Sequence, residues 1–439
     1  MSLTPDDFKF LKGLFQSLEE KPLKPDDYRY VPLYQMDGVD PVERLVRTIQ
    51  FSEVQSRQFF SGFRGSGKST ELWRMRAMLK ERGYLVYYAN ALNYLNPAIP
   101  VDISELLVLL AGAFGDAVEE EEKLSLIGEN YWTRFKNYIT TTQVQLDEVE
   151  LGLFKDVAKL KLAIRDTPSF RQKLQQTLST RLYEVELQVK KFFEDYVKAL
   201  GQKHEGHAGI VFLFDNLEQL RGSASTEQEV IASVQRLFSI HQERLKIPYI
   251  HVVYTVPPWL KFLLAGTEVE ILPSIVQWKN DSGRTQHLEG HACLRQVIEC
   301  RFGKEGFARF FGDGQYADEF VRYCGGNPRD LVRLLRESIR RADSLPITEQ
   351  VVKASLRTIR EQFLPIPTED AIWLYKIAKD RKSALPDGSP ETVARFSLFL
   401  DTHLVLFLRN GDEWYDIHPL IREHVEEIAR VEAKAGSAP

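Results

Sequence analysis

The sequence contains few cysteines, only three in 439 residues. Cys293, Cys300 and Cys324 make an odd number and include no Cys-x-x-Cys pair. Disulfide frameworks use even numbers of cysteines, and zinc sites favour closely spaced pairs. The spacing therefore favours three free, buried thiols over a disulfide or a zinc site.

Long hydrophobic runs are also absent. No stretch reaches the roughly 18 uncharged apolar residues that a transmembrane helix requires. The N-terminal residues 1–7, Met-Ser-Leu-Thr-Pro-Asp-Asp, lack the basic and apolar regions of a signal peptide. We therefore expect a cytoplasmic protein with no membrane partner.

A strong charge of either sign is missing as well. The formal net charge of −5 gives no reason to expect bulk attraction to nucleic acid. Hydrophobic residues make up 44% and charged residues 27% of the chain, which are ordinary globular values. At 439 residues the chain is too long for one core, so roughly two to four domains are expected.

A phosphate-binding motif is present at residues 61–70, Ser-Gly-Phe-Arg-Gly-Ser-Gly-Lys-Ser-Thr, which fit G-x-x-x-x-G-K-[ST]. Residues 58–60 before it form an apolar run typical of a buried strand, and residues 71–82 after it have a helical pattern. In such a loop the backbone N–H groups and the positive end of the helix dipole face the phosphates. The sequence thus predicts a nucleoside triphosphate site.

Each polar residue of this loop has an expected role. Lys68 should neutralise charge on the β- and γ-phosphates, and the Ser69 hydroxyl should complete the Mg²⁺ shell, with Arg64 only flanking the loop. ATP or ADP with Mg²⁺ are the expected ligands. The predicted nucleotide-binding residues of the loop are Gly62, Gly65, Ser66, Gly67, Lys68, Ser69 and Thr70.

A second nucleotide element is expected at residues 209–215, where a continuous apolar run ends in Asp215. A parallel strand buried on both faces has this pattern, and its carboxyl end opens into the ligand crevice. Asp215 is therefore the predicted magnesium-side carboxylate. Glu218 is a candidate general base, because hydrolysis needs a carboxylate near the γ-phosphate. Alternatively, Glu218 is a solvated residue on the following helix.

A third strand is indicated by residues 250–255, Ile-His-Val-Val-Tyr-Thr. Thr255 stands at its end, where it would sense the γ-phosphate. The alternative interpretation is that Thr255 only starts the turn into Pro257 and Pro258. Residues 272–278 resemble the last strand of the core.

A helical region is predicted over residues 290–342, with a break at Cys-Gly-Gly-Asn-Pro-Arg-Asp, residues 324–330. The order of P-loop, Asp strand, polar strand end and Gly-Asn-Pro break is similar to the AAA+ superfamily. It resembles in particular the signal-transducing STAND ATPases and the related origin-recognition ATPases. The resemblance implies a lid, in which Pro328 contacts the base and Arg329 senses phosphate. A simple helix-loop-helix turn is the alternative.

A third unit follows, with helices predicted at residues 369–379 and 390–400 and a hairpin around Asn410-Gly411. These elements resemble a winged helix. From Ile366 to Pro439 there are 9 Lys or Arg and 13 Asp or Glu, which disfavours DNA binding. Residues 417–420, Ile-His-Pro-Leu, resemble the motif that closes the STAND winged helix. That resemblance implies that His418 holds the β-phosphate of ADP, with a helix-capping or packed histidine as the alternative.

The predicted fold class is α/β, a P-loop NTPase of AAA+/STAND-like type with a parallel-sheet core, a helical lid and a C-terminal winged helix. Between Lys68 and Asp215 the chain is about 80 residues longer than one strand-helix-strand-helix passage requires, which indicates an insert of that length. Residues 143–164 alternate like a two-stranded ribbon, and residues 169–200 resemble one long amphipathic helix. The ribbon is either a docking edge or packed on the core. The predicted domains are an N-terminal helical segment (1–40), the core (41–280, insert 118–200), the lid (281–362), the winged helix (366–432) and a disordered tail (433–439).

The resemblance implies a nucleotide-switched regulatory ATPase that hydrolyses ATP slowly and controls a partner effector, and it suggests bacterial defence or stress signalling as the setting. Many related ATPases have Glu directly after the strand Asp, where this chain has Asn216, so the sequence leaves open either slow hydrolysis or almost none. Separate effector and sensor proteins and a homo-oligomer are the expected partners, with Arg284, Arg295 or Arg301 as an arginine finger. The alternatives are a DNA-acting ATPase, as a loader or in transposition, or a nearly inactive nucleotide-binding scaffold.

Overall fold

The computed structural model describes residues 3–35, 40–123, 131–141, 157–223, 225–262, 266–387 and 389–435. Its contacts divide the chain into two compact units. The first, called the sheet unit, comprises residues 43–61 and 75–270. The second, called the loop-and-lid unit, comprises residues 1–42, 62–74 and 271–439 and includes the predicted phosphate-binding loop. The α/β P-loop fold predicted from the sequence is confirmed in both its sheet and its loop.

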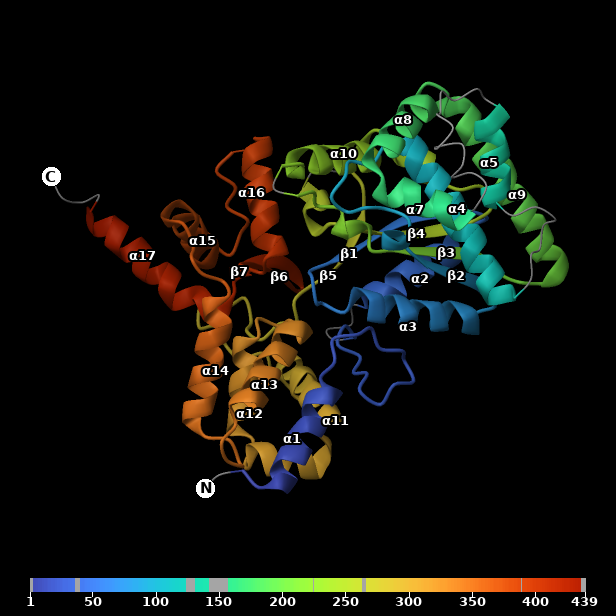
Figure 1. Ribbon diagram of the computed structural model, residues 1–439. Helices are drawn as coiled ribbons and strands as arrows, with labels where there is room; N and C mark the ends of the chain where they lie inside the picture. The colour runs from blue at the N-terminus through green and yellow to red at the C-terminus, as the bar shows by residue number, and fades with distance from the viewer. Residues whose placement is uncertain are drawn as a thin grey trace. The chain divides into compact units, whose positions relative to one another are not determined.

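The sheet has five strands in the order β2-β3-β4-β1-β5 (Figure 1). The pairs β2 with β3, β3 with β4, and β4 with β1 are all parallel. Buried side chains dominate these strands, as expected where a parallel sheet is covered on both faces. The strands are β1 (Ser56–Gly62), β2 (Tyr84–Asn90), β3 (Gly209–Asp215), β4 (His251–Val256) and β5 (Val269–Leu272).

The strand order puts β4 between the strand that leads into the P-loop and the strand that ends in Asp215. In the register, Phe60 of β1 lies beside Thr255 of β4, and Phe214 of β3 lies beside Tyr254. Because the three strands are parallel, their carboxyl ends lie at one edge of the sheet, where ligands bind in such folds. The sheet thus carries Asp215 and Thr255 to the same edge.

Helix α4 packs against several other elements of the sheet unit. Most of its residues are buried because it packs on β2 and against α5, α8 and α9, as Figure 1 illustrates. The Arg171 guanidinium forms a fully buried ion pair with Glu105 of α4. The helices that lie within this unit are α2 (Pro41–Phe51), α4 (Ile103–Glu122), α5 (Tyr131–Thr141), α7 (Val157–Asp166), α8 (Pro168–Ser179), α9 (Leu182–Lys203) and α10 (Glu227–Ser239), with short helices at Ala91–Asn93, Leu217–Gln219, Gln242–Leu245 and Pro258–Phe262.

The predicted ribbon in the insert is wrong in its second half, because Val157–Asp166 is helix α7. Leu160, Ala163 and Ile164 are buried, whereas Leu162 is 55% exposed. Burial at spacings of three and four residues is the pattern of a helix face and not of a strand. The rest of the predicted ribbon, residues 143–156, lies outside the described residues.

The long helix predicted over residues 169–200 is two helices, α8 and α9, separated at Thr180 and Arg181. Thr180 closes α8 by donating its hydroxyl to the carbonyl of Thr177. Both helices contact α4. The two halves of one amphipathic sequence therefore contact α4 as separate helices, which the periodicity of the sequence did not indicate.

The prediction of the last core strand at residues 272–278 is wrong, because β5 spans Val269–Leu272 and shares only Leu272 with that range. Pro273 follows and has no N–H group to donate to a neighbouring strand. Residues 274–278 instead make separate contacts. Ser274 N donates to the Phe407 carbonyl, Ile275 N donates to the Gly326 carbonyl, and Trp278 forms an isolated antiparallel bridge with Gln286.

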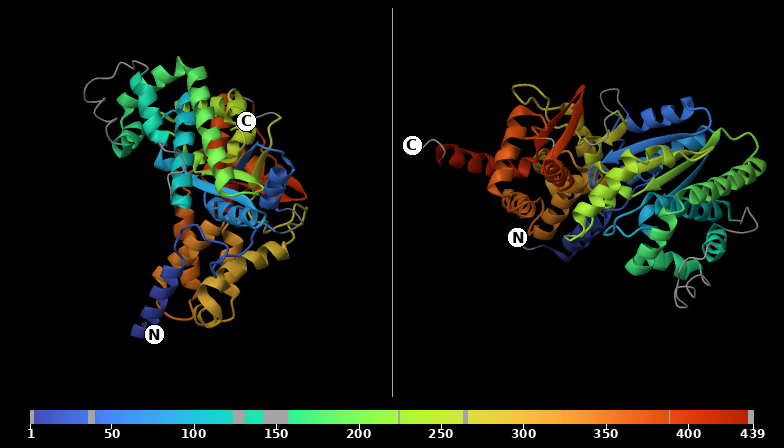
Figure 2. Two further views of the ribbon diagram at one scale, coloured as in Figure 1. Left: turned by 90° about the vertical axis from the view of Figure 1, so that its right-hand side faces the viewer. Right: turned by 90° about the horizontal axis from the view of Figure 1, so that it is seen from above.

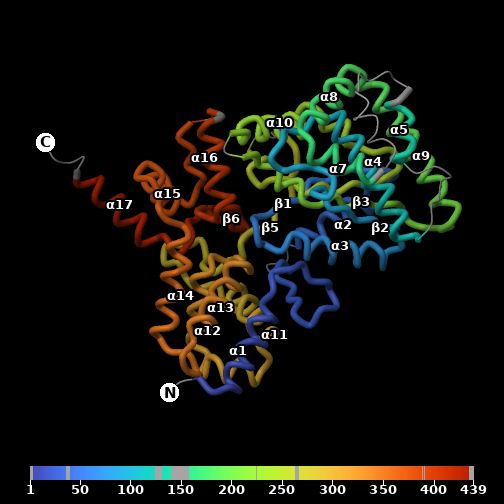
Figure 3. Tube along the Cα trace, viewed as in Figure 1, coloured from blue at the N-terminus to red at the C-terminus, as the bar shows by residue number. Residues whose placement is uncertain are grey.

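The loop-and-lid unit contains a group of helices in which α1 lies beside α11 and α13 (Figure 3). The predicted break between lid helices is confirmed, because α12 ends at Tyr323 and α13 begins at Pro328. The α3 helix starts at Lys68 and passes from this unit into the sheet unit. These helices are α1 (Pro5–Ser17), α3 (Lys68–Glu81), α11 (Leu288–Phe311), α12 (Gln315–Tyr323), α13 (Pro328–Arg341) and α14 (Glu349–Glu361).

The C-terminal segment, residues 368–435, contains the predicted hairpin and the two predicted helices. Leu408 pairs with Trp414 across the hairpin, and the turn is at Asn410-Gly411. Helix α17 extends from the hairpin toward the C-terminus (Figure 2). The elements are α15 (Thr368–Asp380), α16 (Pro390–Asp401), β6 (Val405–Asn410), β7 (Asp412–Ile417), a short helix at Pro419–Ile421 and α17 (Arg422–Ala435).

Residues 324–330, between α12 and the first turn of α13, are called the lid turn. Gly326 provides a test of how this turn is held. Its φ is +72°, and a Cβ placed there would lie 2.1 Å from the Ile275 carbonyl oxygen. We expect Gly326→Ala to lower the free energy of unfolding by about 3 kcal/mol or more, through strain and a backbone clash together. Denaturant titration monitored by circular dichroism measures this loss.

Gly411 supplies the matched control for that variant. Its φ is +88°, but a Cβ would meet no atom within 4 Å. Gly411→Ala should therefore cost only about 1 kcal/mol, the conformational part of the penalty. Equal losses for the two variants would contradict the tight contact between Gly326 and Ile275.

Candidate nucleotide-binding site

The loop between β1 and α3 has the conformation that a phosphate cradle requires. Gly65 and Gly67 have φ values of +86° and +91°, which side-chain-bearing residues rarely adopt. The loop is closed by a hydrogen bond from Ser66 N to the Phe63 carbonyl, and Glu71 N donates to the Gly67 carbonyl in the first turn of α3. The glycines noted in the sequence are therefore needed for the shape of the loop.

Lys68 and Ser66 show that the loop fits an anion. The Lys68 ammonium donates to the carbonyls of Gly62 and Phe63, at 2.8 and 3.3 Å. The Ser66 hydroxyl is buried and has no hydrogen-bond partner among the described residues. A buried hydroxyl without a partner costs free energy unless a ligand or water satisfies it. Phosphate oxygens would satisfy it, and Lys68 has the charge to accompany them.

The N-terminal segment contacts this loop, which the sequence did not indicate. The Tyr34 hydroxyl donates to the Ser66 carbonyl at 2.5 Å, and Leu23 N donates to the Thr70 hydroxyl at 3.1 Å. Beside Tyr34, a groove is lined by Leu33, Pro41, the 273–276 segment and His287. The apolar run Val31-Pro32-Leu33-Tyr34 was the available signal, but nothing in it named its partners.

The lid turn also contacts the loop. The Asn327 amide nitrogen donates to the Arg64 carbonyl at 3.2 Å. Its side-chain oxygen accepts from Arg329 N at 2.9 Å and caps α13. The backbone at Gly65 packs so closely on Arg329 that a Cβ there would lie 2.4 Å from the Arg329 Cβ. The break predicted in the sequence is thus placed on the phosphate-binding loop.

The predicted base and phosphate contacts of the lid lie next to this turn. Pro328 occupies the first position of α13 and is half-buried. The Arg329 guanidinium forms an ion pair with Glu20 at 3.1 Å, and burial lowers the pKa of Arg329. A phosphate ligand would therefore compete with Glu20 for this guanidinium.

In the sheet unit, Asp215 is fully buried at the end of β3. Its carboxylate accepts from the Tyr88 hydroxyl at 2.9 Å and from Asn216 N at 2.8 Å. Burial, followed by the nearby Asp215 charge, raises the pKa of Tyr88, so this hydroxyl remains a donor. Tyr88 orients the predicted magnesium-side carboxylate, and no pattern in the sequence indicated this contact.

The residues after Asp215 form a tight turn. Asn216 adopts a left-handed conformation with a φ of +71°. The Thr255 hydroxyl at the end of β4 accepts from Leu217 N at 3.2 Å, so Thr255 holds this turn in place. Glu218 lies in a short 3-10 helix and is only 8% exposed. It is therefore not the solvated helix residue that one interpretation expected.

His418 is fully buried at the end of β7. Its Nδ1 accepts from Leu420 N at 3.3 Å, and its ring stacks on Phe363 with centroids 4.6 Å apart. Its Nε2 lies 3.9 Å from the Asp330 carboxylate, and the ring is in close contact with Gly325. In this arrangement His418 is a helix cap that faces the lid turn.

This burial makes the stability of the protein dependent on pH. Burial lowers the pKa of His418 from 6.5 to about 4. Between pH 6.5 and 4 the unfolded chain therefore binds a proton at His418 that the folded chain does not bind. The free energy of unfolding falls as the pH drops through this range. His418→Asn keeps a capping acceptor but does not titrate. We expect this variant to lose about 2–3 kcal/mol less over that range, as measured by denaturant titration at each pH.

The free energy of unfolding measured below pH 4 provides the control for this prediction. Burial alone would raise the pKa of Asp330, but the hydrogen bond from His403 and the nearby charges hold it at about 2. The stability from Asp330 is therefore lost only as the pH falls from 3.8 toward 2. The hydrogen bond from His403 is the largest of the contributions that lower this pKa, and His418→Asn leaves it in place, so the variant should retain most of that loss. Equal slopes for both proteins between pH 6.5 and 4 would contradict the assignment to His418.

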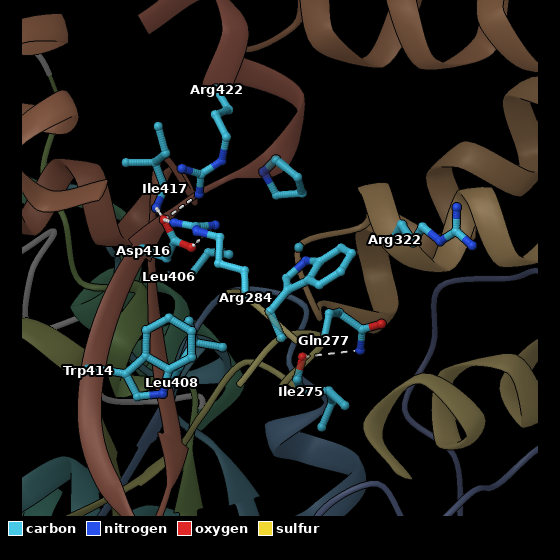
Figure 4. Close-up of a pocket in the computed structure, with 13 residues that line it drawn as sticks. Ile275, Gln277, Arg284, Arg322, Leu406, Leu408, Trp414, Asp416, Ile417 and Arg422 are labelled. Atoms are coloured by element: carbon cyan, nitrogen blue, oxygen red, sulfur yellow. Dashed lines mark hydrogen bonds and ion pairs between the residues drawn. The ribbon is translucent and has the colours of Figure 1, made fainter. Parts of the chain in front are cut away.

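The three candidate finger arginines all have partners in their own chain. Arg295 pairs with Asp318 and Glu299, and Arg301 donates to the carbonyls of Arg29 and Val297. Arg284 and Arg422 converge on Asp416 beside a small pocket at the hairpin (Figure 4). An arginine finger in trans would have to break one of these sets of contacts.

The described residues contain no group of three or more His, Cys, Asp or Glu side chains that could hold a metal ion by themselves. A magnesium ion held by one hydroxyl, one carboxylate and phosphate oxygens does not need such a group. All three cysteines are free thiols, but only Cys324 is buried as predicted, whereas Cys293 and Cys300 are partly exposed. In the part of the chain that the structure describes, no helix has the length and apolarity to cross a membrane.

No protein-family model matches the chain, and no curated protein matches it. Solved structures that align with most of it include three ATPases. The ORC2 protein of Aeropyrum pernix, in ADPNP–ADP complexes, has 13% identity and a TM-score of 0.38, and the match covers 95% of this chain and 98% of that one. The Walker-type ATPase of Pyrococcus abyssi has 14% identity, a TM-score of 0.39 and coverages of 94% and 99%.

The RuvB Holliday junction branch migration motor of Thermotoga maritima has 11% identity and a TM-score of 0.34, with coverages of 91% and 98%. At TM-scores below 0.5, the assignment of a function depends on the residues of this chain.

Proposed function

We propose that this protein is a nucleotide-switched regulatory ATPase. It binds ATP with Mg²⁺ at the loop of residues 62–70, hydrolyses ATP slowly, and controls a partner protein through the difference between its ATP and ADP states. The setting that the sequence resemblance suggests is bacterial defence or stress signalling.

The observation that carries this proposal is the set of contacts on the phosphate-binding loop. Tyr34, Asn327 and the hairpin all contact it, the last through Phe63, whose ring lies 6.4 Å from that of Phe407. A conformational change of the loop on nucleotide binding would directly alter its contacts with the N-terminal segment, the lid turn and the C-terminal segment. Such differential contacts are what a ligand needs to shift a conformational equilibrium.

The residues of the chain supply positioning and charge for phosphoryl transfer. Lys68 and the Ser66 hydroxyl would hold phosphate oxygens, and Ser69 and Asp215 would hold Mg²⁺. When bound, Mg²⁺ neutralises the charge that develops between the β- and γ-phosphates. Tyr88 would keep the Asp215 carboxylate oriented.

Hydrolysis would depend on Glu218 as general base and on Thr255 near the γ-phosphate. Glu218 is separated from Asp215 by Asn216 and Leu217, and Thr255 already accepts a hydrogen bond from Leu217 N. This constrained turn supports slow hydrolysis, because a base that is not held close to the attacking water transfers a proton inefficiently.

The base of the nucleotide would lie near Pro328 and the groove beside Tyr34, and Arg329 would contact phosphate. His418 would favour the resting ADP state from its place against Gly325, which is two residues before Asn327. Separate effector and sensor proteins and a homo-oligomer are the proposed partners.

The proposal is tested by identifying the nucleotide that purified protein releases on denaturation, using ion-exchange chromatography. Stoichiometric ADP that is lost in His418→Ala would support a switch held at rest by bound product. A site that is empty and exchanges nucleotide freely would overturn the ADP-locked resting state.

The same preparation tests the DNA-acting alternative. The acidic balance of residues 366–439 argues against it, because phosphate neutralisation supplies most of the affinity for DNA. Hydrolysis that DNA stimulates, and that Lys68→Ala abolishes, would replace the regulatory proposal with a DNA-acting one.

A further inference from the structure

His403 occupies an unusual position at the end of α16. It is 7% exposed, and its φ is +61°, although it is not a glycine. A side-chain-bearing residue in this region costs of order 1 kcal/mol and persists where the surroundings over-determine it. The contacts of the His403 side chain must therefore hold this conformation.

The imidazole of His403 joins two residues of the lid turn. Its Nδ1 lies 2.9 Å from the Asp330 carboxylate, and its Nε2 lies 3.3 Å from the Asn327 amide nitrogen. Its ring is edge-on to Phe63 of the phosphate-binding loop, with centroids 6.0 Å apart. One side chain from the C-terminal segment thus meets both the lid turn and the loop.

The hydrogen-bond chemistry fixes the tautomer of His403. The Asn327 side-chain oxygen is occupied by the backbone of α13, so the nitrogen faces His403 and can only donate. Nε2 must then accept, and Nδ1 must carry the proton that is donated to Asp330. The arrangement requires a neutral imidazole in one orientation.

Asn327 connects this imidazole to the nucleotide site, because its amide nitrogen is shared between His403 Nε2 and the Arg64 carbonyl. A displacement of the loop at Arg64 would pull on Asn327 and change its contact with His403. This chain of hydrogen bonds runs from the loop to the end of α16 without a gap.

We propose that His403 is a positioning residue that couples the phosphate-binding loop to the C-terminal segment through Asn327. Its regulatory meaning rests on the proposed function, since it supplies the route by which bound nucleotide would act on that segment. The coupling itself exists in the protein without nucleotide.

The variant that separates the two bonds is His403→Asn. Asn tolerates a positive φ, and its amide nitrogen occupies the place of Nδ1, so the bond to Asp330 is kept while the contact with Asn327 is lost. His403→Gln does the reverse, because its longer side chain reaches toward Asn327 with a carbonyl oxygen. The matched control is His424→Asn, the same change at a half-buried histidine on α17.

The first measurement is hydrogen exchange of the amides of residues 64–67 without nucleotide. We expect exchange about tenfold faster in His403→Asn, partial recovery in His403→Gln, and no change in His424→Asn. Unchanged exchange in His403→Asn, with the fold intact by circular dichroism, would overturn the coupling whether or not the protein binds nucleotide.

The second measurement adds ADP and follows the amides of β6 and β7. In the wild-type protein ADP should slow their exchange about fivefold, and in His403→Asn this response should disappear while the Kd for ADP changes less than about threefold. A response of wild-type size in His403→Asn would overturn the regulatory role. No ADP binding by the wild-type protein would instead defeat the proposed function and leave the first measurement to decide the coupling.

Discussion

Lys68→Ala is expected to weaken the binding of ATP and ADP by at least about 100-fold, which corresponds to roughly 3 kcal/mol. The Lys68 ammonium is nearly buried and lies on the carbonyls of Gly62 and Phe63, within the loop itself. Removing it takes away the main positive charge of the cradle. Isothermal titration calorimetry with ADP measures the loss directly.

Lys80→Ala is the matched control, since Lys80 lies on the same helix but pairs with Glu121 in an ion pair that is 40% exposed. Exposed ion pairs contribute little to stability, so this variant should bind nucleotide like the wild-type protein. If Lys68→Ala bound ADP as tightly as Lys80→Ala does, the loop would not be the nucleotide site.

Glu218→Gln is expected to reduce the rate of ATP hydrolysis by about 10²- to 10⁴-fold while changing nucleotide affinity less than about threefold. Glu218 is 8% exposed in the turn that follows Asp215, so the substitution removes a carboxylate without changing the size of a buried side chain. Single-turnover hydrolysis of radiolabelled ATP separates this effect from product release.

The control for Glu218 is Glu229→Gln on α10, where the carboxylate is exposed. It should hydrolyse ATP at the wild-type rate. Wild-type turnover that survives in Glu218→Gln would assign the base to another residue. No turnover in the wild-type protein would favour the nucleotide-binding scaffold, in which Asn216 has replaced the usual catalytic carboxylate.

Lys68, Glu218 and His403 would act at different steps. Lys68 bears on binding, Glu218 on chemistry, and His403 on the transmission of the bound state to the C-terminal segment. Because His403 reaches the loop through Asn327, its loss should leave binding and hydrolysis nearly intact. The three sets of variants therefore distinguish a failure to bind, a failure to hydrolyse and a failure to respond.

The sequence by itself determined the features that are built from neighbouring residues. The spacing of Gly65, Gly67 and Lys68 specifies the loop, because only glycine takes the required positive φ at low cost. The apolar run ending in Asp215 specifies a buried strand, and Asn410-Gly411 specifies the hairpin turn. These patterns act over a few residues, so no knowledge of the fold was needed.

Predictions from local sequence patterns were wrong where one hydrophobic pattern is compatible with two different structures. Leu160, Leu162 and Ile164 alternate as in a strand, but burial of Ala163 in place of Leu162 makes the segment a helix. Residues 169–200 have one amphipathic period, yet α8 and α9 separate so that both pack on α4. The available packing surface decided each case.

Only the tertiary structure decided which distant side chains meet. Tyr34 on Ser66, Asn327 on Arg64 and His403 on Asp330 join segments that lie far apart in the sequence. Such pairs carry no periodicity or spacing, because each depends on how whole helices and strands pack. The sequence therefore specified the loop that would bind phosphate. The fold specified which distant segments contact that loop and would respond to a bound nucleotide.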